Sequence, residues 1–277
     1  MARIVLFVAL TFVFSLPFYV YLALKPASWS SLESHALMWM PALAALATSL
    51  LTGRPLRKLG FRLGTWRHYL VSYDVPLLFC GVVYAVVWAT GLGAFDTARL
   101  IPFEARIGLP HSALTAVIVG IGLLVLTPLS MINTLGEELG WSGLLTPELA
   151  ARTTFAKASL IRGAIWSLWH YPLVIVLLPR YRPDLPIAYA LACMTIAVTS
   201  ISFVYTWLRL DSGSVWPVAL LHAASSNLQD FFEALTRDTG RTHWITYEYG
   251  CGFAIVLAAV ALVMWRRATA SPSAAFP

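Results

Sequence analysis

Long runs of uncharged, mostly apolar residues alternate with short polar segments along this chain of 277 residues. About eight runs meet or approach the roughly 17 to 25 residues that a membrane-spanning helix requires. Because a backbone in lipid must satisfy its own hydrogen bonds, each run is expected to be helical. The pattern predicts an all-α polytopic membrane bundle with spans near residues 3–24, 35–53, 69–92, 111–145, 157–179, 186–208, 213–235 and 248–265.

The composition agrees with a membrane protein. Hydrophobic residues make up 59% of the chain and charged residues 12%, with a mean hydropathy of +0.74, whereas soluble domains carry about 25% charged residues. The first run, from Ile4 to Leu24, is longer than the core of a secretory signal and no small-residue cleavage motif follows it. We therefore expect it to be a retained anchor.

The distribution of lysine and arginine predicts the orientation, because cytoplasmic loops are enriched in both. With both termini in the cytoplasm, the cytoplasmic segments hold twelve of the 19 basic residues: Arg3, Arg54, Arg57, Lys58, Arg62, Arg67, Arg152, Lys157, Arg162, Arg209, Arg266 and Arg267. The net charge of +6 is mainly this topology signal. No pattern of basic and aromatic residues suggests a nucleic-acid site.

One domain is the simplest organisation. We expect residues 1–267 to form a single transmembrane helical domain and residues 268–277, rich in Ala, Ser and Pro, to be a flexible tail. No internal repeat of fixed period is visible. Cys80, Cys193 and Cys251 lie in different apolar runs without metal-ligand spacing, so we interpret them as packing residues.

Glu137 and Glu138 are the most informative residues. They follow an uncharged run from Ile107 to Gly136, at a place where the sequence predicts membrane interior. An ionisable group at bilayer depth costs a few kcal/mol or more, so such groups usually face a polar cavity and mark function. The alternative is that the pair lies in the headgroup region where the helix leaves the bilayer.

Two histidines in other spans lie at comparable depth. His170 follows Trp166 by one helical turn, and His222 lies in the seventh span. From a rise of about 1.5 Å per residue, the first glutamate and both histidines lie roughly 12 to 20 Å from the predicted cytoplasmic helix ends. They are therefore expected to meet in one cavity that opens to the cytoplasm. A lone membrane histidine is more often an interhelical hydrogen-bonding residue.

Such a cavity suits amide hydrolysis by an activated water. A carboxylate beside a neutral imidazole can hold a water molecule and take its proton, while a second imidazole and an amide stabilise the oxyanion. No serine or cysteine nucleophile is required. Because the sequence His-Glu-x-x-His is absent, a zinc site formed by the histidines and a glutamate is the weaker alternative.

Three motifs in order, Glu-Glu-Leu-Gly-Trp, Trp-Ser-Leu-Trp-His-Tyr-Pro and Ser-Gly-Ser-Val-Trp-Pro-Val-Ala-Leu-Leu-His-Ala, resemble the CPBP family of intramembrane glutamic proteases. This family, also called the Abi or CAAX-protease-and-bacteriocin-processing family, includes the type II CAAX prenyl endopeptidases. The resemblance extends over about residues 129–236. It implies a metal-independent, cofactor-free protease whose substrate is a membrane-associated or lipidated peptide, at the cytoplasmic side of a bacterial inner membrane.

The resemblance also implies residue roles. Glu137 would activate water together with His170, His222 and a following asparagine would contact the oxyanion, and Glu138 would support the site. Trp166 lies beside His170 and is a further supporting candidate.

Two positions depart from the family pattern. The family arginine of Glu-Glu-x-x-x-Arg is replaced by Ser142, so its charge pairing must come from elsewhere, with Arg152 and Arg162 as candidates. In His-x-x-x-Asn, position four is Ser226 and the asparagine is Asn227, about 140° round the helix from the histidine. We favour Asn227, realigned by a π-bulge, with Ser226 as the alternative donor.

Other functions stay open. A catalytically weak family member could act as a membrane immunity or scaffold partner, which the serine at the arginine position favours. A proton-coupled transporter could use the same buried carboxylates as a relay, although no inverted repeat is evident. Trp141, Trp166 and Trp169 could line a lipid groove, but packing or an interfacial belt is the simpler interpretation.

Overall fold

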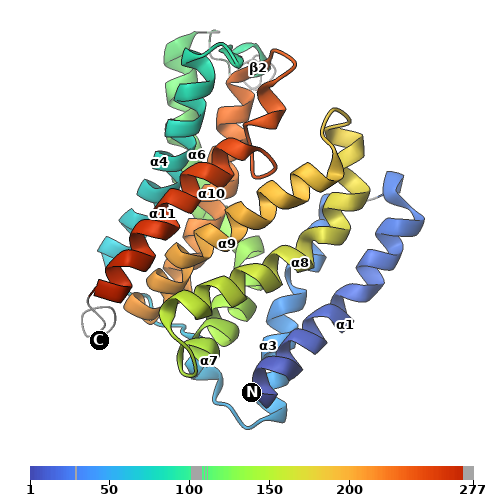
Figure 1. Ribbon diagram of the computed structural model, residues 1–277, viewed down its shortest axis with the longest axis vertical. Coiled ribbons are helices and arrows are strands. Elements are labelled where there is room, and N and C mark those ends of the chain that lie inside the picture. Colours follow the sequence, from blue (N-terminus) through green and yellow to red (C-terminus); the bar gives the residue numbers. More distant parts are fainter. Residues whose placement is uncertain (29, 101–107, 109, 111, 271–277) are drawn as a thin grey trace.

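The computed structural model describes residues 1–28, 30–100, 108, 110 and 112–270. Long helices run side by side through the molecule, which confirms the predicted helical membrane bundle (Figure 1). The helices of the first half are α1 (Ala2–Leu24), α2 (Ser31–Met38), α3 (Met40–Leu51), α4 (Trp66–Ala89) and α6 (Ala113–Glu138). Those of the second half are α7 (Thr146–Ala150), α8 (Phe155–Tyr181), α9 (Ile187–Ser212), α10 (Trp216–Ala234) and α11 (Cys251–Ala270).

Within the described residues, seven helical segments are long and apolar enough to cross a membrane. They lie where seven of the predicted spans were expected. The remaining predicted span, residues 213–235, forms α10, which has a suitable length but contains Asp230 and Glu233 and does not reach the same hydropathy. The N-terminus and the end of α11 lie at the same end of the bundle (Figure 1), which we call the terminal end. The far end carries the loops after α1, α4, α8 and α10.

Short elements complete the chain. In the described part of the chain, four are 3-10 turns: Pro26–Ser28, Leu56–Leu59, Ala98–Leu100 and Thr242–Trp244. At the far end, β1 (Gly93–Phe95) pairs antiparallel with β2 (Thr236–Asp238), joining the segments after α4 and α10. This small sheet was not predicted. The expected tail is helical up to Ala270, and residues 271–277 lie outside the described residues.

The core lies around α9, which packs along α8 and α11, while α10 packs between α4 and α6. Small residues allow the closest approaches. A Cβ on Gly163 would lie 2.4 Å from Thr199 Cα, so α8 and α9 meet at van der Waals distance. This close crossing brings the polar residues of α8 against α9.

The segment after the glutamate pair is tightly packed too. A Cβ on Gly136 would lie 2.7 Å from the Met38 carbonyl oxygen, and one on Gly140 would lie 2.5 Å from Pro41 Cβ. These two glycines, four residues apart, form the small-residue surface on which helices in membranes pack closely. They press the α6 end against the junction of α2 and α3.

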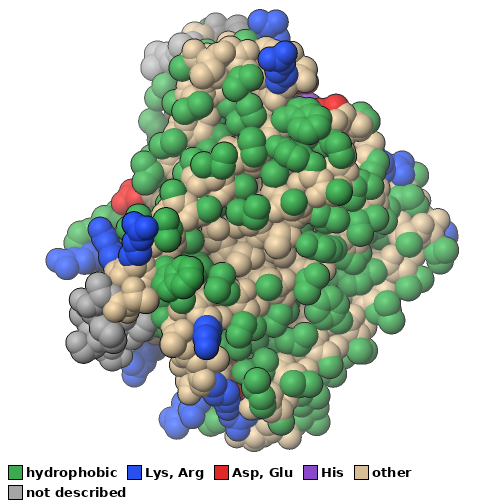
Figure 2. All heavy atoms as spheres, viewed as in Figure 1, with side chains coloured by type: hydrophobic (Ala, Val, Ile, Leu, Met, Phe, Trp, Pro, Cys, Tyr) green, Lys and Arg blue, Asp and Glu red, His purple; other side chains and the backbone are tan. Residues whose placement is uncertain are grey.

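Side-chain chemistry follows the same plan. On the visible face, hydrophobic side chains cover the middle of the bundle, with Lys and Arg toward its ends (Figure 2). Exposed apolar residues such as Val125, Leu129 and Ile132 on α6 suit contact with lipid. These exposed apolar faces identify an integral membrane protein.

Candidate active site

The chain switches from α to π geometry directly after the glutamate pair. Residues Leu139–Leu145 form a π-helix, η4, that links α6 to α7. π segments are rare and often occur at functional sites. The spacing of His222 and Asn227 predicted such a bulge in α10 instead, but α10 is a regular α-helix from Trp216 to Ala234. The prediction of a π-bulge in α10 is therefore wrong, and the π geometry lies in η4 instead.

Glu137 is held by two indoles. Its side chain is 2% exposed, and its Oε2 accepts hydrogen bonds from Trp166 Nε1 at 2.7 Å and from Trp141 Nε1 at 3.3 Å. These donors come from two elements, α8 and η4. They fix one carboxylate oxygen, while the residue also lines a cavity of about 450 Å³. The pair thus lies inside the bundle, not among lipid headgroups.

His170 lies beside the same tryptophan. Its Nδ1 is 3.0 Å from the Trp166 carbonyl oxygen, which can only accept, so Nδ1 carries the proton and Nε2 of the neutral ring is an acceptor. The ring also lies edge-on to Trp169, with centroids 4.8 Å apart. One tryptophan therefore contacts both predicted members of the water-activating pair, and both line the same cavity.

Glu138 points to a different set of partners. Its carboxylate is 3.0 Å from Arg162 Nη2 and 3.1 Å from His222 Nδ1, and Ser142 Oγ donates to it as well. The glutamate, the arginine and the serine are fully buried. Glu138, Arg162 and His222 form what we call the floor cluster. It lies beneath the cavity, where His222 presents its ring to the cavity lining.

Arg162 makes further contacts through its Nη1 atom and the face of its guanidinium, whereas its buried Nε has no hydrogen-bond partner among the described residues. Its Nη1 donates to Ser202 Oγ at 2.9 Å, and its guanidinium lies 4.7 Å from the Trp166 ring centroid and 4.6 Å from that of Tyr205. Cation–π contacts of a desolvated guanidinium contribute about 2 kcal/mol. Tyr205 was missed in the sequence, because an aromatic residue in an apolar run carries no signal of this role.

Residues 110–228 match the family model of the type II CAAX prenyl endopeptidase Rce1-like family. The expected family resemblance is confirmed. CAAX prenyl protease 2 of Methanococcus maripaludis is 32% identical over 106 residues, which cover 37% of this chain. The chain matches 38% of the length of that curated relative.

The CAAX-protease-like segment, residues 110–228, lacks the family arginine, and the structure supplies a cation from another helix. Arg162 of α8 pairs with Glu138, as one of the two candidates was expected to do. Arg152, the other candidate, pairs with Glu148 at 2.9 Å. Ser142, at the arginine position, keeps a hydrogen bond to the same carboxylate.

The second departure of the CAAX-protease-like segment concerns the residue that follows His222. Asn227 turns toward α6, where its Nδ2 donates to Thr127 Oγ1 and Ser130 Oγ, each at 3.0 Å. Ser226 lines the cavity together with His222 and His170. Because α10 contains no bulge, Ser226 and not Asn227 lies in the cavity lining, and its Oγ donates to the His222 carbonyl oxygen at 3.3 Å. Which of the two contacts the oxyanion stays a prediction.

The cavity opens at the unexpected end. Besides the glutamate and the histidines, its lining includes Tyr181 and Arg182 at the end of α8 and Tyr247–Tyr249 before α11. These residues belong to the far end, whereas the predicted topology placed the opening at the terminal end. The predicted depths were counted from the helix ends at the terminal end, and packed side chains close the bundle there.

The loop of Tyr247–Tyr249, to which the sequence assigned no role, forms part of this opening. Tyr247 has a φ of 62°, the one positive φ of a non-glycine residue within the described part of the chain. Burial raises the pKa of Tyr247 well above its usual range, so its hydroxyl stays protonated and donates to Asp230 at 2.8 Å. Backbone strain of this kind persists where surrounding contacts hold it.

Trp141, Trp166 and Trp169 are buried. The indole N–H groups of Trp141 and Trp166 donate to Glu137, and that of Trp169 donates to Ser15. They are packing and positioning residues, not an interfacial belt. Among the described residues, no group of three or more His, Cys, Asp and Glu side chains is arranged to hold a metal ion.

Proposed function

We propose that this chain is an intramembrane endopeptidase that hydrolyses a peptide bond with a water activated by Glu137 and His170. The observation that carries the proposal is the shared cavity: a carboxylate and an imidazole acceptor face it, and both are held by Trp166. The similarity to CAAX prenyl proteases supports a hydrolase of this kind.

The proposed reaction needs no covalent intermediate. Water bound between the Glu137 carboxylate and His170 Nε2 gives a proton to the carboxylate as its oxygen attacks the peptide carbonyl carbon. When the carbon–nitrogen bond breaks, that proton passes to the leaving amine. General base catalysis of this type contributes about 10² to 10⁴ in rate.

The oxyanion would be stabilised from α10. In its imidazolium form, His222 donates from Nε2, while Nδ1 donates to Glu138. Ser226 Oγ, one turn later on the same face, is the second donor that we propose, once its hydroxyl rotates away from the His222 carbonyl oxygen to which it donates at 3.3 Å. The guanidinium and imidazolium of the floor cluster balance the charges of the two glutamates, so the dry site holds no excess charge.

The substrate class follows from the surroundings. A cavity within a membrane bundle suits a membrane-associated or lipidated peptide, as the name of the relative suggests for that protein. We place the chain in a bacterial inner membrane, with no resident metal or cofactor. The alternative, a weakly active scaffold or immunity protein, is less favoured because Arg162 supplies the cation that Ser142 lacks.

A peptide library incubated with purified protein in liposomes tests the proposal. We expect cleavage by the parent, and loss of at least 10²-fold in rate in Glu137→Gln and His170→Ala. His68→Ala and Asp211→Asn are matched controls, because that pair lies at the terminal end, 2.9 Å apart and away from the cavity. Equal cleavage by all variants would mean a contaminating protease.

A further inference from the structure

The entrance to the cavity lies at the far end of the bundle. Tyr181, which lines the cavity where α8 ends, is 69% exposed, so the cavity reaches the surface there. Leu173 and Leu177 line the path from that residue down to His170 along the same helix. The entrance, the path and the site therefore follow one face of α8.

The terminal end is closed by side chains. Trp141, Leu144 and Leu145 of η4 are fully buried, and so are Glu138 and Arg162 of the floor cluster. Phe7 of α1 packs edge-on against Trp141, with ring centroids 5.6 Å apart. This packed layer separates the site from the loops at the terminal end.

The two ends differ in charge. Exposed basic residues gather at the terminal end in the loop after α3, in the first turn of α4, in the loop before α8 and at the end of α11: Arg57, Lys58, Arg62, Arg67, Arg152, Arg266 and Arg267. By the positive-inside rule, this end faces the cytoplasm.

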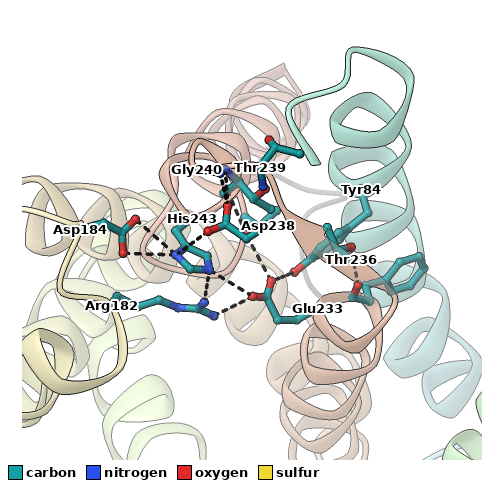
Figure 3. Close-up of polar contacts among 12 residues, drawn as sticks. Tyr84, Arg182, Asp184, Glu233, Thr236, Asp238, Thr239, Gly240 and His243 are labelled. Carbon is teal, nitrogen blue, oxygen red and sulfur yellow. Dashed lines mark hydrogen bonds and ion pairs between the residues drawn. The ribbon is translucent and has the colours of Figure 1, made fainter. Parts of the chain in front are cut away.

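At the far end, the cations nearest the cavity entrance are accompanied by carboxylates. Around the entrance, Arg182 and His243 are surrounded by Asp184, Asp238 and Glu233 (Figure 3). Among the described residues, no Lys, Arg or His nitrogen lies within 4.0 Å of the carboxylate of Glu248, which also lines the cavity. Within the described residues, carboxylates balance the exposed cations Lys25, Arg180, Arg237 and Arg241 of this end, so it lacks the excess of positive charge that marks a cytoplasmic face.

We propose that the site is entered from the extracytoplasmic face, so that the substrate is a peptide segment exposed on that side of the membrane. This inference rests on the proposed hydrolytic function for the identity of the substrate, but the direction of entry follows from the structure and the charges alone. It replaces the cytoplasmic opening that the predicted topology implied.

Cysteine labelling with a membrane-impermeant maleimide tests the direction of entry. Tyr181→Cys reports on the entrance, Leu177→Cys on the interior of the cavity, and Arg62→Cys on the terminal end. Each is made in the full chain carrying Cys251→Ser, because Cys80 and Cys193 are buried and Cys251 is half-buried. The variants are labelled in intact bacterial cells and in inverted membrane vesicles.

We expect at least tenfold more labelling of the first two cysteines in intact cells than in inverted vesicles, and the reverse for Arg62→Cys. Labelling of Leu177→Cys from the Arg62 side would overturn the proposal, as would absence of labelling at the far end in intact cells. Arg180→Cys, exposed at the same helix end, serves if Tyr181→Cys is not produced.

The labelling separates this inference from the proposed function, since it requires no turnover. If labelling is as expected but Glu137→Gln cleaves peptides like the parent, the hydrolytic proposal fails and the entrance stands. If the glutamate is essential but the cavity is labelled from the Arg62 side, the entrance is wrong and the hydrolytic proposal stands.

Discussion

The protein uses the same three groups at two levels of the cavity, with different consequences. In the floor cluster, Glu138 bridges Arg162 and His222. At the entrance, Glu233 bridges Arg182 and His243, and we call these three residues the rim cluster. Each contains a carboxylate, a guanidinium and an imidazole.

Burial separates the two clusters. The side chains of Glu138 and Arg162 are 0% exposed, whereas those of Glu233 and Arg182 are 11% and 18% exposed. The distance between imidazole nitrogen and carboxylate oxygen is also longer, 3.8 Å in the rim cluster against 3.1 Å in the floor cluster. Water can therefore replace a lost partner at the rim but not at the floor.

The largest expected effect is the loss of the floor cation. Arg162→Met leaves the Glu138 carboxylate buried without its guanidinium, which costs about 3–5 kcal/mol of folding free energy. The matched change at the rim, Arg182→Met, should cost about 1 kcal/mol or less because the pair is partly solvated. Denaturant unfolding in detergent measures both, and equal losses would contradict the comparison.

Moving the cation between helices is expected to have the next largest effect. Ser142→Arg alone places a second guanidinium in a dry site and should destabilise the protein by several kcal/mol. Combined with Arg162→Ser, it restores one cation at the family position and should recover at least half of that loss. A double-mutant cycle gives the coupling. Additive losses would mean that the two positions do not share Glu138.

The stability that the rim cluster contributes should depend on salt concentration, whereas that of the floor cluster should not. Raising the salt concentration from about 0.1 M to 1 M shortens the Debye length from about 10 Å to about 3 Å. We expect the stability difference between Arg182→Met and the parent to shrink, and that of Arg162→Met to change little. The same unfolding assay at two salt concentrations decides this, and a salt-dependent floor would break the distinction.

The smallest effect concerns acid at the rim. Burial opposes ionisation of Asp238, but hydrogen bonds from Gly240 and Thr242 and the nearby His243 outweigh it and lower its pKa. A lowered pKa stabilises the fold above the unfolded value of about 3.9. This stability is lost as the pH falls through the lower folded value.

Asp238→Asn should therefore lose less thermal stability than the parent when the pH falls below about 4. Melting curves in detergent between pH 7 and pH 3 provide the measurement. Arg62→Gln, exposed at the terminal end, is the control and should follow the parent, because a guanidinium keeps its charge throughout this pH range. Identical acid profiles for parent and Asp238→Asn would contradict a stabilising role for the ionised Asp238.

Sequence patterns predicted the helices because each span is set by its own apolar composition. They also identified Glu137, Glu138, His170 and His222, since polar groups stand out in apolar runs. The pairing of β1 with β2 had no such signal, because strands of three residues depend on contacts made by the helices around them.

Two features of the site depended on tertiary packing. The π geometry lies in η4, in which Gly140 packs against Pro41, and not in α10. The direction of the cavity was predicted wrongly because helix depth says nothing about which end side chains fill. Phe7 and Trp141 fill the terminal end, and their contact joins residues distant in sequence.

The most direct test of the account compares Glu137→Gln with Glu138→Gln in the same two assays, unfolding and peptide cleavage. The account predicts that Glu137→Gln folds within about 1 kcal/mol of the parent, since its indole partners remain, and loses at least 10²-fold in cleavage rate. Glu138→Gln should instead lose several kcal/mol of stability. Cleavage at the parental rate by folded Glu137→Gln would contradict the central claim.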